Sequence, residues 1–473
     1  MKIRNPRSGE MDYEIPDFTS DQVKQICDEL RQNQYDWASS GVQHRIDVLQ
    51  AWKAAVTKHE IALIEALTND TGRIWETKLE VQIVNTSIER WCGIAASFFI
   101  DEVQQASSIP FIQLQQSLVS FELIGVISPW NFPLLLSLID TIPALLAGCA
   151  VVVKPSEVTP RFIAVMQNII DEVPELKKVL AYIPGDGKVG ADLVQQADLI
   201  CFTGSTATGK KVYDAASKKM IPVFLELGGK DPAIVLESAD LLLAAKAIAW
   251  GSTANAGQSC LSIERIYVQD KVFDPFVQLL IEEANDLILN ADNISHGEIG
   301  PIIFEKQATI INEHLKDAFE KGALILTGSK QCELINGGYY CKPTVLINVS
   351  HEMKIMTEET FGPIMPVMKF STKEEGIELA NGTIYGLSAA VFAGTVDEAM
   401  EFGKHIHGGA ISINDAALTA IMHEGEKNSF KMSGIGGTRM GPSAIKRFMR
   451  QKVFIIKDQP IVAPWMSAKF RSY

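Results

Sequence analysis

The chain has few of the features that mark nucleic-acid-binding or disulfide-rich proteins. Its 473 residues hold 43 lysines and arginines against 57 aspartates and glutamates, and the net charge of −14 disfavours a broad phosphate-binding surface. No nucleic acid is therefore expected as a partner. The seven cysteines include no CxxC pair, which argues against a disulfide framework or a metal cluster and indicates free thiols in a reducing compartment.

Long uninterrupted hydrophobic runs are also missing. The N-terminal segment MKIRNPRSGEMDYEIPDF has no apolar stretch of the kind that a secretory signal needs, so a cytoplasmic location is expected. The longest apolar run, from Trp130 to Val153, contains Asp140, Pro133 and Pro143. An aspartate at the centre of a bilayer costs about 2.5–3.5 kcal/mol, and proline interrupts a helix. The run is therefore interpreted as a buried loop, helix and strand, and no membrane association is expected.

The N-terminal part of the chain has helical patterns, and two strand patterns stand apart from the rest. Thr19 and Gln22 form a capping-box pattern that opens a helix to about Ser39, and the residues after it continue as amphipathic helices. These further helices are predicted for residues 41–66 and 79–100. Period-two alternation predicts a strand over 111–122, and an isolated strand is predicted for 453–457.

Between these strands the chain alternates strand and helix patterns. Strands are predicted for residues 123–127, 150–153, 180–183, 199–203 and 233–236, with helices beginning near residues 160, 188, 207 and 241. A second series starts at 264–268. Such alternation predicts an α/β fold with parallel sheets wrapped by helices, and the length of 473 residues predicts two or three domains.

Two segments carry residues suited to covalent catalysis. Glu226 lies in LELGGK, and Cys260 ends GQSC. A thiol attacks carbonyl carbon well, and a carboxylate can serve as general base. Either residue alone is a weak signal, because a cysteine preceded by small residues is usually a buried packing residue.

Three further segments follow predicted strands, where ligands of an open α/β sheet bind. Lys154 and Glu157, in KPSE, suit the hydroxyls of a ribose, although a solvated turn fits the same residues. Gly204 and Ser205 open GSTATG before a helix, whose N-terminus favours a phosphate. Lys211 stands where a nucleoside-triphosphate loop needs serine or threonine, which argues against a phosphotransferase.

The third of these segments is SPWNFP, which holds Asn131 between prolines and aromatic residues. A carboxamide in a rigid frame can donate a hydrogen bond to an oxyanion. Taken alone, a buried asparagine that satisfies loop carbonyls is the better interpretation.

Taken together, these motifs resemble those of the aldehyde dehydrogenase superfamily, in its hydrolytic, non-acylating type. SPWNFP, KPSE, FTGSTATG, LELGGK, GQSC and EETFGP follow one another in order, and the resemblance covers residues 123–452. It implies a parallel-sheet cofactor domain of residues 1–106 and 126–228 and a parallel-sheet catalytic domain of residues 229–451. A small β bridging element for oligomerisation is implied for residues 107–125 and 452–473, and a homodimer or homotetramer is expected.

The resemblance also implies a mechanism for a small-molecule aldehyde. Cys260 attacks the aldehyde carbon, and the Asn131 carboxamide and the Cys260 backbone N–H hold the alkoxide of the thiohemiacetal. Hydride transfer to NAD leaves a thioester, and Glu226 activates the water that releases the carboxylic acid. Two other classes stay open: a binding or structural protein that has lost activity, and a thiol hydrolase in which Gln258 donates to an oxyanion.

For the cofactor, the resemblance implies Lys154 and Glu157 on the adenosine ribose and Ser205 near the pyrophosphate. Glu359 is implied on the nicotinamide ribose. The predicted cofactor set is completed by Trp130, Gly204 and Phe361. Glu157 would meet the 2′-phosphate of NADP with like charge, so NAD is favoured over NADP.

Three features depart from the family pattern or stay undecided. Many members have PFGGxK where this chain has EKNSFK at residues 426–431, so the family's substrate wall cannot be carried over and the aldehyde is not named. Arg450 is aligned with a second, deep glutamate of the family. His405 and His407 lack the neighbours that a metal site needs, and no metal is expected; His423 has a modest prospect of reaching the substrate mouth.

Overall fold

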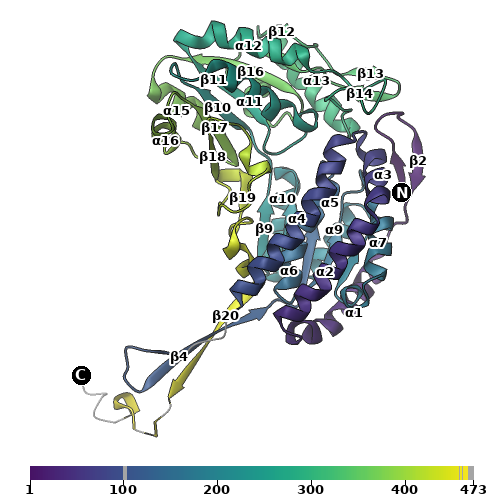
Figure 1. Cartoon of the computed structure of the whole chain (residues 1–473), viewed down its shortest axis with the longest axis vertical. Helices are drawn as coiled ribbons and strands as arrows, with labels where there is room; N and C mark the ends of the chain where they lie inside the picture. Colours follow the sequence, from purple (N-terminus) through teal and green to yellow (C-terminus); the bar gives the residue numbers. More distant parts are fainter. Residues whose placement is uncertain (100–103, 458, 461, 467–473) are drawn as a thin grey trace.

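The computed structural model describes residues 1–99, 104–457, 459–460 and 462–466, and the chain forms two layered units and a protruding hairpin-like sheet (Figure 1). Two large sheets, of six and seven strands, are mostly parallel, and a separate sheet of three strands is antiparallel. The predicted α/β class with two parallel sheets and a small β element is confirmed. Within the described residues no helix has the length and apolar character needed to span a membrane.

Four helices of the N-terminal region pack along one side of the first unit (Figure 1). They are α1 (Ser20–Ser39), α2 (Val42–Lys58), α3 (Glu60–Thr71) and α4 (Trp75–Phe98). The predicted capping box is confirmed, because the Thr19 side chain accepts from the Gln22 backbone and the Gln22 side chain accepts from the Thr19 backbone. The single helix predicted for residues 41–66 is wrong, since α2 and α3 meet at His59. Residue 100 of the next predicted helix lies outside the described residues.

The six-stranded sheet of the first unit has the order β19-β9-β8-β5-β6-β7. Its strands are β5 (Leu123–Ile127), β6 (Ala150–Lys154), β7 (Leu180–Tyr182), β8 (Leu199–Thr203), β9 (Val223–Glu226) and β19 (Gly434–Ile435). Its helices are α5 (Pro133–Leu138), α6 (Thr141–Leu146), α7 (Phe162–Asp171), α8 (Pro174–Lys177), α9 (Gly187–Gln196) and α10 (Thr206–Lys219). The apolar run before β6 is thus a loop, two short helices and a strand, as predicted.

The seven-stranded sheet of the second unit has the order β12-β15-β16-β11-β10-β17-β18. Its strands are β10 (Asp231–Val235), β11 (Ile263–Gln269), β12 (Leu324–Thr327), β15 (Thr344–Ile347), β16 (Ile364–Phe370), β17 (Ser388–Phe392) and β18 (Ala410–Ile413). Its helices are α11 (Leu241–Thr253), α12 (Phe273–Asp286), α13 (Glu305–Glu320), α14 (Lys354–Thr357), α15 (Lys373–Asn381) and α16 (Val396–Gly403). Two small hairpins are β1 (Lys2–Arg4) with β2 (Met11–Glu14) and β13 (Glu333–Ile335) with β14 (Gly338–Tyr340).

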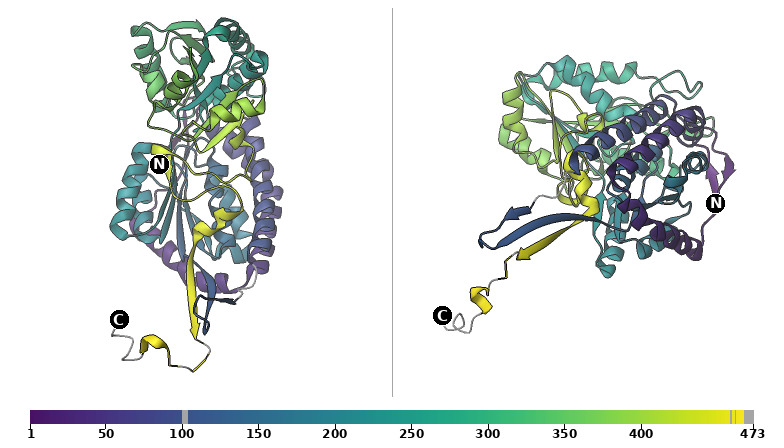
Figure 2. Two further views of the ribbon diagram at one scale, coloured as in Figure 1. Left: turned by 90° about the vertical axis from the view of Figure 1, so that its left-hand side faces the viewer. Right: turned by 60° about the horizontal axis from the view of Figure 1, so that its bottom comes forward.

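The three-stranded sheet projects away from both units (Figures 1 and 2). It consists of β3 (Gln104–Ala106), β4 (Ile112–Ser120) and β20 (Met449–Lys457), in the order β20-β4-β3. The predicted strand at residues 453–457 therefore begins earlier, at Met449. Residues 100–103 of the predicted cofactor domain and residues 458, 461 and 467–473 of the predicted bridging element lie outside the described residues, and the predicted domain limits stay a prediction.

The register of the first sheet brings several marked segments to one edge. Ile127 of β5 lies opposite both Lys154 of β6 and Phe202 of β8, and Thr203 lies opposite Glu226 of β9. The chain leaves β5 for β6 and β7 on one side and then returns to β8 and β9 on the other. Ligands of such sheets bind at this reversal, beyond the carboxyl ends of the strands.

Candidate active site

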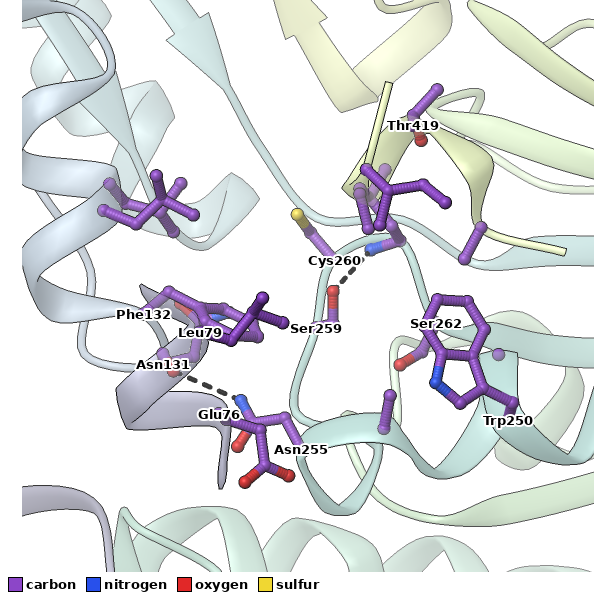
Figure 3. Close-up of a pocket in the computed structure, with 18 of the residues that line it drawn as sticks. Glu76, Leu79, Asn131, Phe132, Trp250, Asn255, Ser259, Cys260, Ser262 and Thr419 are labelled. Atoms are coloured by element: carbon purple, nitrogen blue, oxygen red, sulfur yellow. Dashed lines mark hydrogen bonds between the residues drawn. The ribbon is translucent and has the colours of Figure 1, made fainter. Parts of the chain in front are cut away.

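A cavity of about 600 Å³ contains the three residues predicted to be catalytic. Asn131, Glu226 and Cys260 all line it, together with side chains of α4, α5 and α11. The Cys260 sulfur points into the space between the side of the cavity that carries Leu79 and the side that carries Thr419 (Figure 3). The fold therefore brings together residues that lie far apart in the sequence.

A tight turn after α11 presents Cys260 to this cavity. Three consecutive residues, Asn255, Ala256 and Gly257, have φ values of 56°, 54° and 71°, in the left-handed region that side chains disfavour. At Gly257 a Cβ atom would lie 2.3 Å from the carbonyl of Gly362, so only glycine fits. GQSC is thereby packed against EETFGP.

Both polar atoms of the Gln258 side chain form hydrogen bonds that stabilise this turn. Its Nε2 donates to the carbonyls of Asn255 (2.9 Å) and Pro301 (3.2 Å), and its Oε1 accepts from the Ile303 backbone N–H (2.8 Å). The donor that a Gln258 oxyanion hole requires is therefore already committed to the loop. The thiol-hydrolase alternative loses its proposed donor.

Asn131 is buried beside the cysteine loop and is bonded to it. Its Nδ2 donates to the Gln258 carbonyl (3.0 Å), and its backbone carbonyl accepts from Asn255 Nδ2 (3.2 Å) and from Arg73 (2.5 Å). A carboxamide nitrogen carries two hydrogens. Within the described chain one of them has an acceptor, and the second can reach an oxygen in the cavity.

Cys260 differs from the other thiols in its exposure. All seven cysteines are free, and six are buried, whereas Cys260 is half-buried at the cavity wall. Loss of water and the nearby Glu359 carboxylate raise the pKa of the Cys260 thiol to about 12, and the charge of Lys427 opposes this rise. The thiol is therefore protonated at neutral pH in the free protein, and its activation requires a further positive charge or a base.

Glu226 lies at the carboxyl end of β9 and is held by the segment that departs from the family pattern. Its Oε2 accepts a hydrogen bond from Ser429 Oγ (2.9 Å), and the next residue, Leu227, donates its N–H to the Ser433 carbonyl (2.9 Å). The contact joins residues 203 positions apart. Sequence reasoning missed Ser429, because no local spacing marks a serine in EKNSFK as the partner of a carboxylate.

LELGGK contacts both of the other motifs near the thiol. A Cβ atom on Gly229 would lie 2.3 Å from the Cys260 carbonyl, and the Gly229 N–H donates to Glu359 Oε1 (3.0 Å). The buried Lys230 Nζ bonds Glu264 (2.6 Å) and Thr360 Oγ1 (2.9 Å). Burial, with the neighbouring Glu264, raises the pKa of Glu359 to about 8.

Four of the predicted cofactor residues lie at the edge of the first sheet. The buried Lys154 Nζ bonds Glu157 Oε2 (2.9 Å), while the Glu157 side chain is 44% exposed and can accept further bonds. Gly204 follows β8, and Ser205 is the N-cap of α10. The Ser205 Oγ accepts a hydrogen bond from the Thr208 N–H (3.3 Å). An N-terminus of this kind suits an anionic pyrophosphate.

Of the other three predicted cofactor residues, Glu359 and Phe361 belong to EETFGP, and Trp130 packs against Phe361. The rings of Trp130 and Phe361 meet edge to face with centroids 5.4 Å apart, and Glu359 lies beside Phe361 in the chain. None of the predicted cofactor residues lines the cavity. The cavity is therefore the candidate substrate side of the site, and the sheet edge is the candidate cofactor side.

Comparison with known proteins agrees with this arrangement. The family model "Aldehyde dehydrogenase family" matches residues 1–454. The chain belongs to the aldehyde dehydrogenase family. It is 32% identical over 443 residues to "Putative succinate-semialdehyde dehydrogenase (NADP(+)) 2" of Mycobacterium ulcerans (strain Agy99), covering 92% of this chain and 84% of that protein.

Solved structures of aldehyde dehydrogenases superpose along almost the whole chain. The structure of "Putative Aldehyde Dehydrogenase PutA" from Anabaena variabilis is 55% identical, with a TM-score of 0.97, and the match covers 98% of this chain and 99% of that one. Betaine aldehyde dehydrogenase from Staphylococcus aureus, in complex with NAD+, is 29% identical with a TM-score of 0.92, covering 99% and 93%.

One residue of this aldehyde dehydrogenase was placed wrongly from the sequence. Arg450 lies on β20 with its guanidinium over the Phe121 ring and does not line the cavity. A buried arginine that does line the cavity is Arg439, whose Nη2 bonds Asp140 (2.6 Å) and Thr203 Oγ1 (2.7 Å). The segment before it has no helical or strand periodicity, so the sequence gives no local signal for its position.

The histidines singled out in the sequence lie in different settings. Among the described residues, no cluster of histidine, cysteine and carboxylate side chains is suited to hold a metal ion. His405 is an exposed residue near Glu401 (4.0 Å). His423 lines the cavity, in line with its predicted reach toward the substrate mouth.

Proposed function

We propose that this aldehyde dehydrogenase oxidises an aldehyde to the carboxylic acid with NAD, using Cys260 as nucleophile, Asn131 as oxyanion donor and Glu226 as base. The observation that carries the proposal is that these three side chains line one cavity, directly beside the sheet edge where Lys154, Glu157 and Ser205 lie. A thiol, a carboxylate and a fixed amide donor are the groups that covalent oxidation of an aldehyde requires.

In the first step the Cys260 thiol, whose ionisation the positive ring of a bound cofactor would favour, gives its proton to water, and its sulfur bonds to the aldehyde carbon. The carbonyl π electrons move to oxygen, and this alkoxide accepts hydrogen bonds from Asn131 Nδ2 and from the Cys260 backbone N–H. Asn131 is suited to the task because Arg73, Asn255 and Gln258 fix it before substrate arrives.

The residues at the sheet edge fit a dinucleotide. The exposed Glu157 carboxylate can accept from ribose hydroxyls, and the first turn of α10 offers backbone N–H groups to a pyrophosphate. NAD, when bound, supplies the hydride acceptor and a positive ring. Lys154 keeps Glu157 in place through their hydrogen bond.

Glu226 acts in the second half of the reaction. Its carboxylate takes a proton from water, the water oxygen bonds to the thioester carbon, and the carbon–sulfur bond breaks to release the acid and restore Cys260. Ser429 holds one carboxylate oxygen and leaves the other for water. The direct test is NADH formation by the full chain with a panel of aldehydes. The protein is purified under reducing conditions, which suit its free cysteines and the expected cytoplasmic location.

Glu157→Gln is expected to shift cofactor choice toward NADP. The relatives do not decide this choice, since one is named for NADP and another is in complex with NAD. A carboxylate that accepts from both ribose hydroxyls contributes roughly 1.5–3 kcal/mol, while a 2′-phosphate removes a donor and adds repulsion. The wild type should favour NAD by about tenfold or more in kcat/KM, and the variant should narrow this ratio.

Glu175→Gln is a matched control for this variant. Glu175 also bonds a lysine three residues away, Lys178, at 2.9 Å, but lies outside the site. The control should keep the NAD preference of the wild type. Equal use of NAD and NADP by the wild type, or an unchanged ratio in Glu157→Gln, would remove Glu157 from the cofactor site.

Assembly into a homodimer or a dimer of dimers is expected through the projecting sheet. β20 is an edge strand, and its Phe454 and Ile455 side chains are exposed. An exposed apolar edge invites strand pairing with a second copy. Sedimentation at micromolar concentration should give a dimer or tetramer, and Ile455→Lys should weaken it; a stable, active wild-type monomer would contradict the expectation.

A further inference from the structure

The wall of the cavity around Cys260 is mostly aliphatic and aromatic (Figure 3). The side chains that matter for a substrate come from α4, from the SPWNFP loop with α5, and from α11 with the loop after β18. Its large apolar side chains include Phe132, Leu135, Leu136, Ile139, Trp250 and Ile421. A volume of about 600 Å³ is much larger than a short aldehyde needs.

The apolar wall continues from the cavity to the surface. Trp75 and Leu79 of α4 are 59% and 51% exposed, and Ile421 is 58% exposed, yet all three line the cavity. Large apolar side chains that gather at the mouth of a pocket mark a surface for an apolar ligand. They form a continuous path from water to the thiol.

Most of the charged groups inside the cavity already have partners, and the Lys427 ammonium is the exception among the described residues. Arg439 bonds Asp140 and Thr203, and Glu80 accepts from the Leu135 N–H (2.8 Å) next to Arg73. Lys427 also lines the cavity, and its charge acts on Cys260. Away from Lys427, a charged group on the substrate tail would lose its water without gaining a free partner along the apolar wall.

The outer part of the cavity carries an excess of negative charge. Glu76, Glu283 and Glu298 line it there, against one ammonium from Lys246. Lys246 and Glu298 are exposed, and the other two are half-buried. This arrangement repels a substrate that bears a carboxylate. It attracts a cation at the mouth, so exclusion of a cationic tail rests on the cost of removing its water along the apolar wall.

We infer that the preferred substrates are neutral aldehydes with a long apolar tail, which lies along Phe132, Leu136 and Trp250 toward Leu79 and Ile421. The inference rests on the proposed function and names its substrate class. It sets this chain apart from the relatives named for succinate semialdehyde and betaine aldehyde, whose substrates carry a negative and a positive charge.

The test measures kcat/KM for straight-chain aldehydes from propanal to decanal at saturating NAD. Burial of each methylene contributes about 0.8 kcal/mol, so kcat/KM should rise by about fourfold per carbon until the tail fills the cavity. Two matched pairs test charge. Methyl 4-oxobutanoate should exceed succinate semialdehyde, and 3,3-dimethylbutanal should exceed betaine aldehyde, each by about tenfold or more.

Leu79→Glu places a charge on the apolar path. Decanal should lose about tenfold in kcat/KM, because the tail must then pass a carboxylate, whereas propanal should stay within about twofold. Ile61→Glu is the matched control, an exposed apolar helix position away from the cavity. Ala420→Trp offers a second variant that narrows the cavity and should likewise impair decanal more than propanal.

A binding measurement separates this inference from the proposed function. Decanamide, which cannot be oxidised, should protect Cys260 from alkylation by iodoacetamide at concentrations where butanamide does not. Absence of NADH formation with every aldehyde would overturn the proposed function, whereas protection by decanamide would still support the apolar path. Oxidation of succinate semialdehyde or betaine aldehyde at least as efficiently as its neutral partner would overturn the inference alone.

Discussion

Replacing Cys260 by alanine is expected to abolish aldehyde oxidation and any ester hydrolysis by this chain, while NAD binding is kept. Only the covalent step needs sulfur, and loss of a catalytic nucleophile costs about 10⁴-fold or more in kcat. The residues at the sheet edge, including Lys154 and Ser205, are left in place. Steady-state NADH formation measures the loss, and equilibrium titration with NAD measures the retained binding.

Cys27→Ala provides the control for this variant. Cys27 is buried on α1, and burial raises the pKa of its thiol to about 12, so it offers a similar sulfur that does not line the cavity. The control should keep its activity. Dehydrogenase turnover by Cys260→Ala within about tenfold of the wild type, roughly 1.4 kcal/mol of barrier, would rule out Cys260 as the nucleophile.

Glu226→Gln is expected to block release of the acid far more than hydride transfer. The amide keeps the shape of the carboxylate and its contact with Ser429 but cannot accept the proton of water. General-base catalysis contributes about 10²–10⁴-fold, so the steady rate should fall by that factor. Rapid mixing should show a burst of about one NADH per site, followed by slow turnover, because the thioester accumulates.

Glu76→Gln makes the same chemical change elsewhere in the cavity. Glu76 lines the cavity (Figure 3) but has no proposed part in the chemistry. Its steady rate with decanal should stay near that of the wild type. Joint loss of the burst and of the steady rate in Glu226→Gln would mean that Glu226 acts before hydride transfer or only in folding.

Local chemistry made much of the fold and the motifs predictable. The capping box at Thr19, the strand Leu123–Ile127 and the strand–helix alternation depend on neighbours within a few residues, so their patterns survive in the sequence. The break at His59 was not predicted, since amphipathic periodicity runs on through α2 and α3. A helix boundary inside a continuous periodic pattern has no strong local signal.

Side-chain contacts between distant segments could not be predicted, because they too leave no local signal in the sequence. The bond from Ser429 to Glu226 and the bonds from Arg439 to Asp140 and Thr203 join segments that are hundreds of residues apart. Arg450 does not reach the deep position predicted for it, because position along the chain does not decide which side chain an irregular loop brings to the cavity.

The sequence by itself determined the α/β class and the family, and it predicted the chemically active side chains, because each is encoded by residue type within short motifs. Only the tertiary structure decided that Asn131, Glu226 and Cys260 line one cavity apart from the predicted cofactor residues, and that this cavity has an apolar wall. The wall is built from loops and helix faces of both units, and which of these faces meet is set by packing across the whole chain.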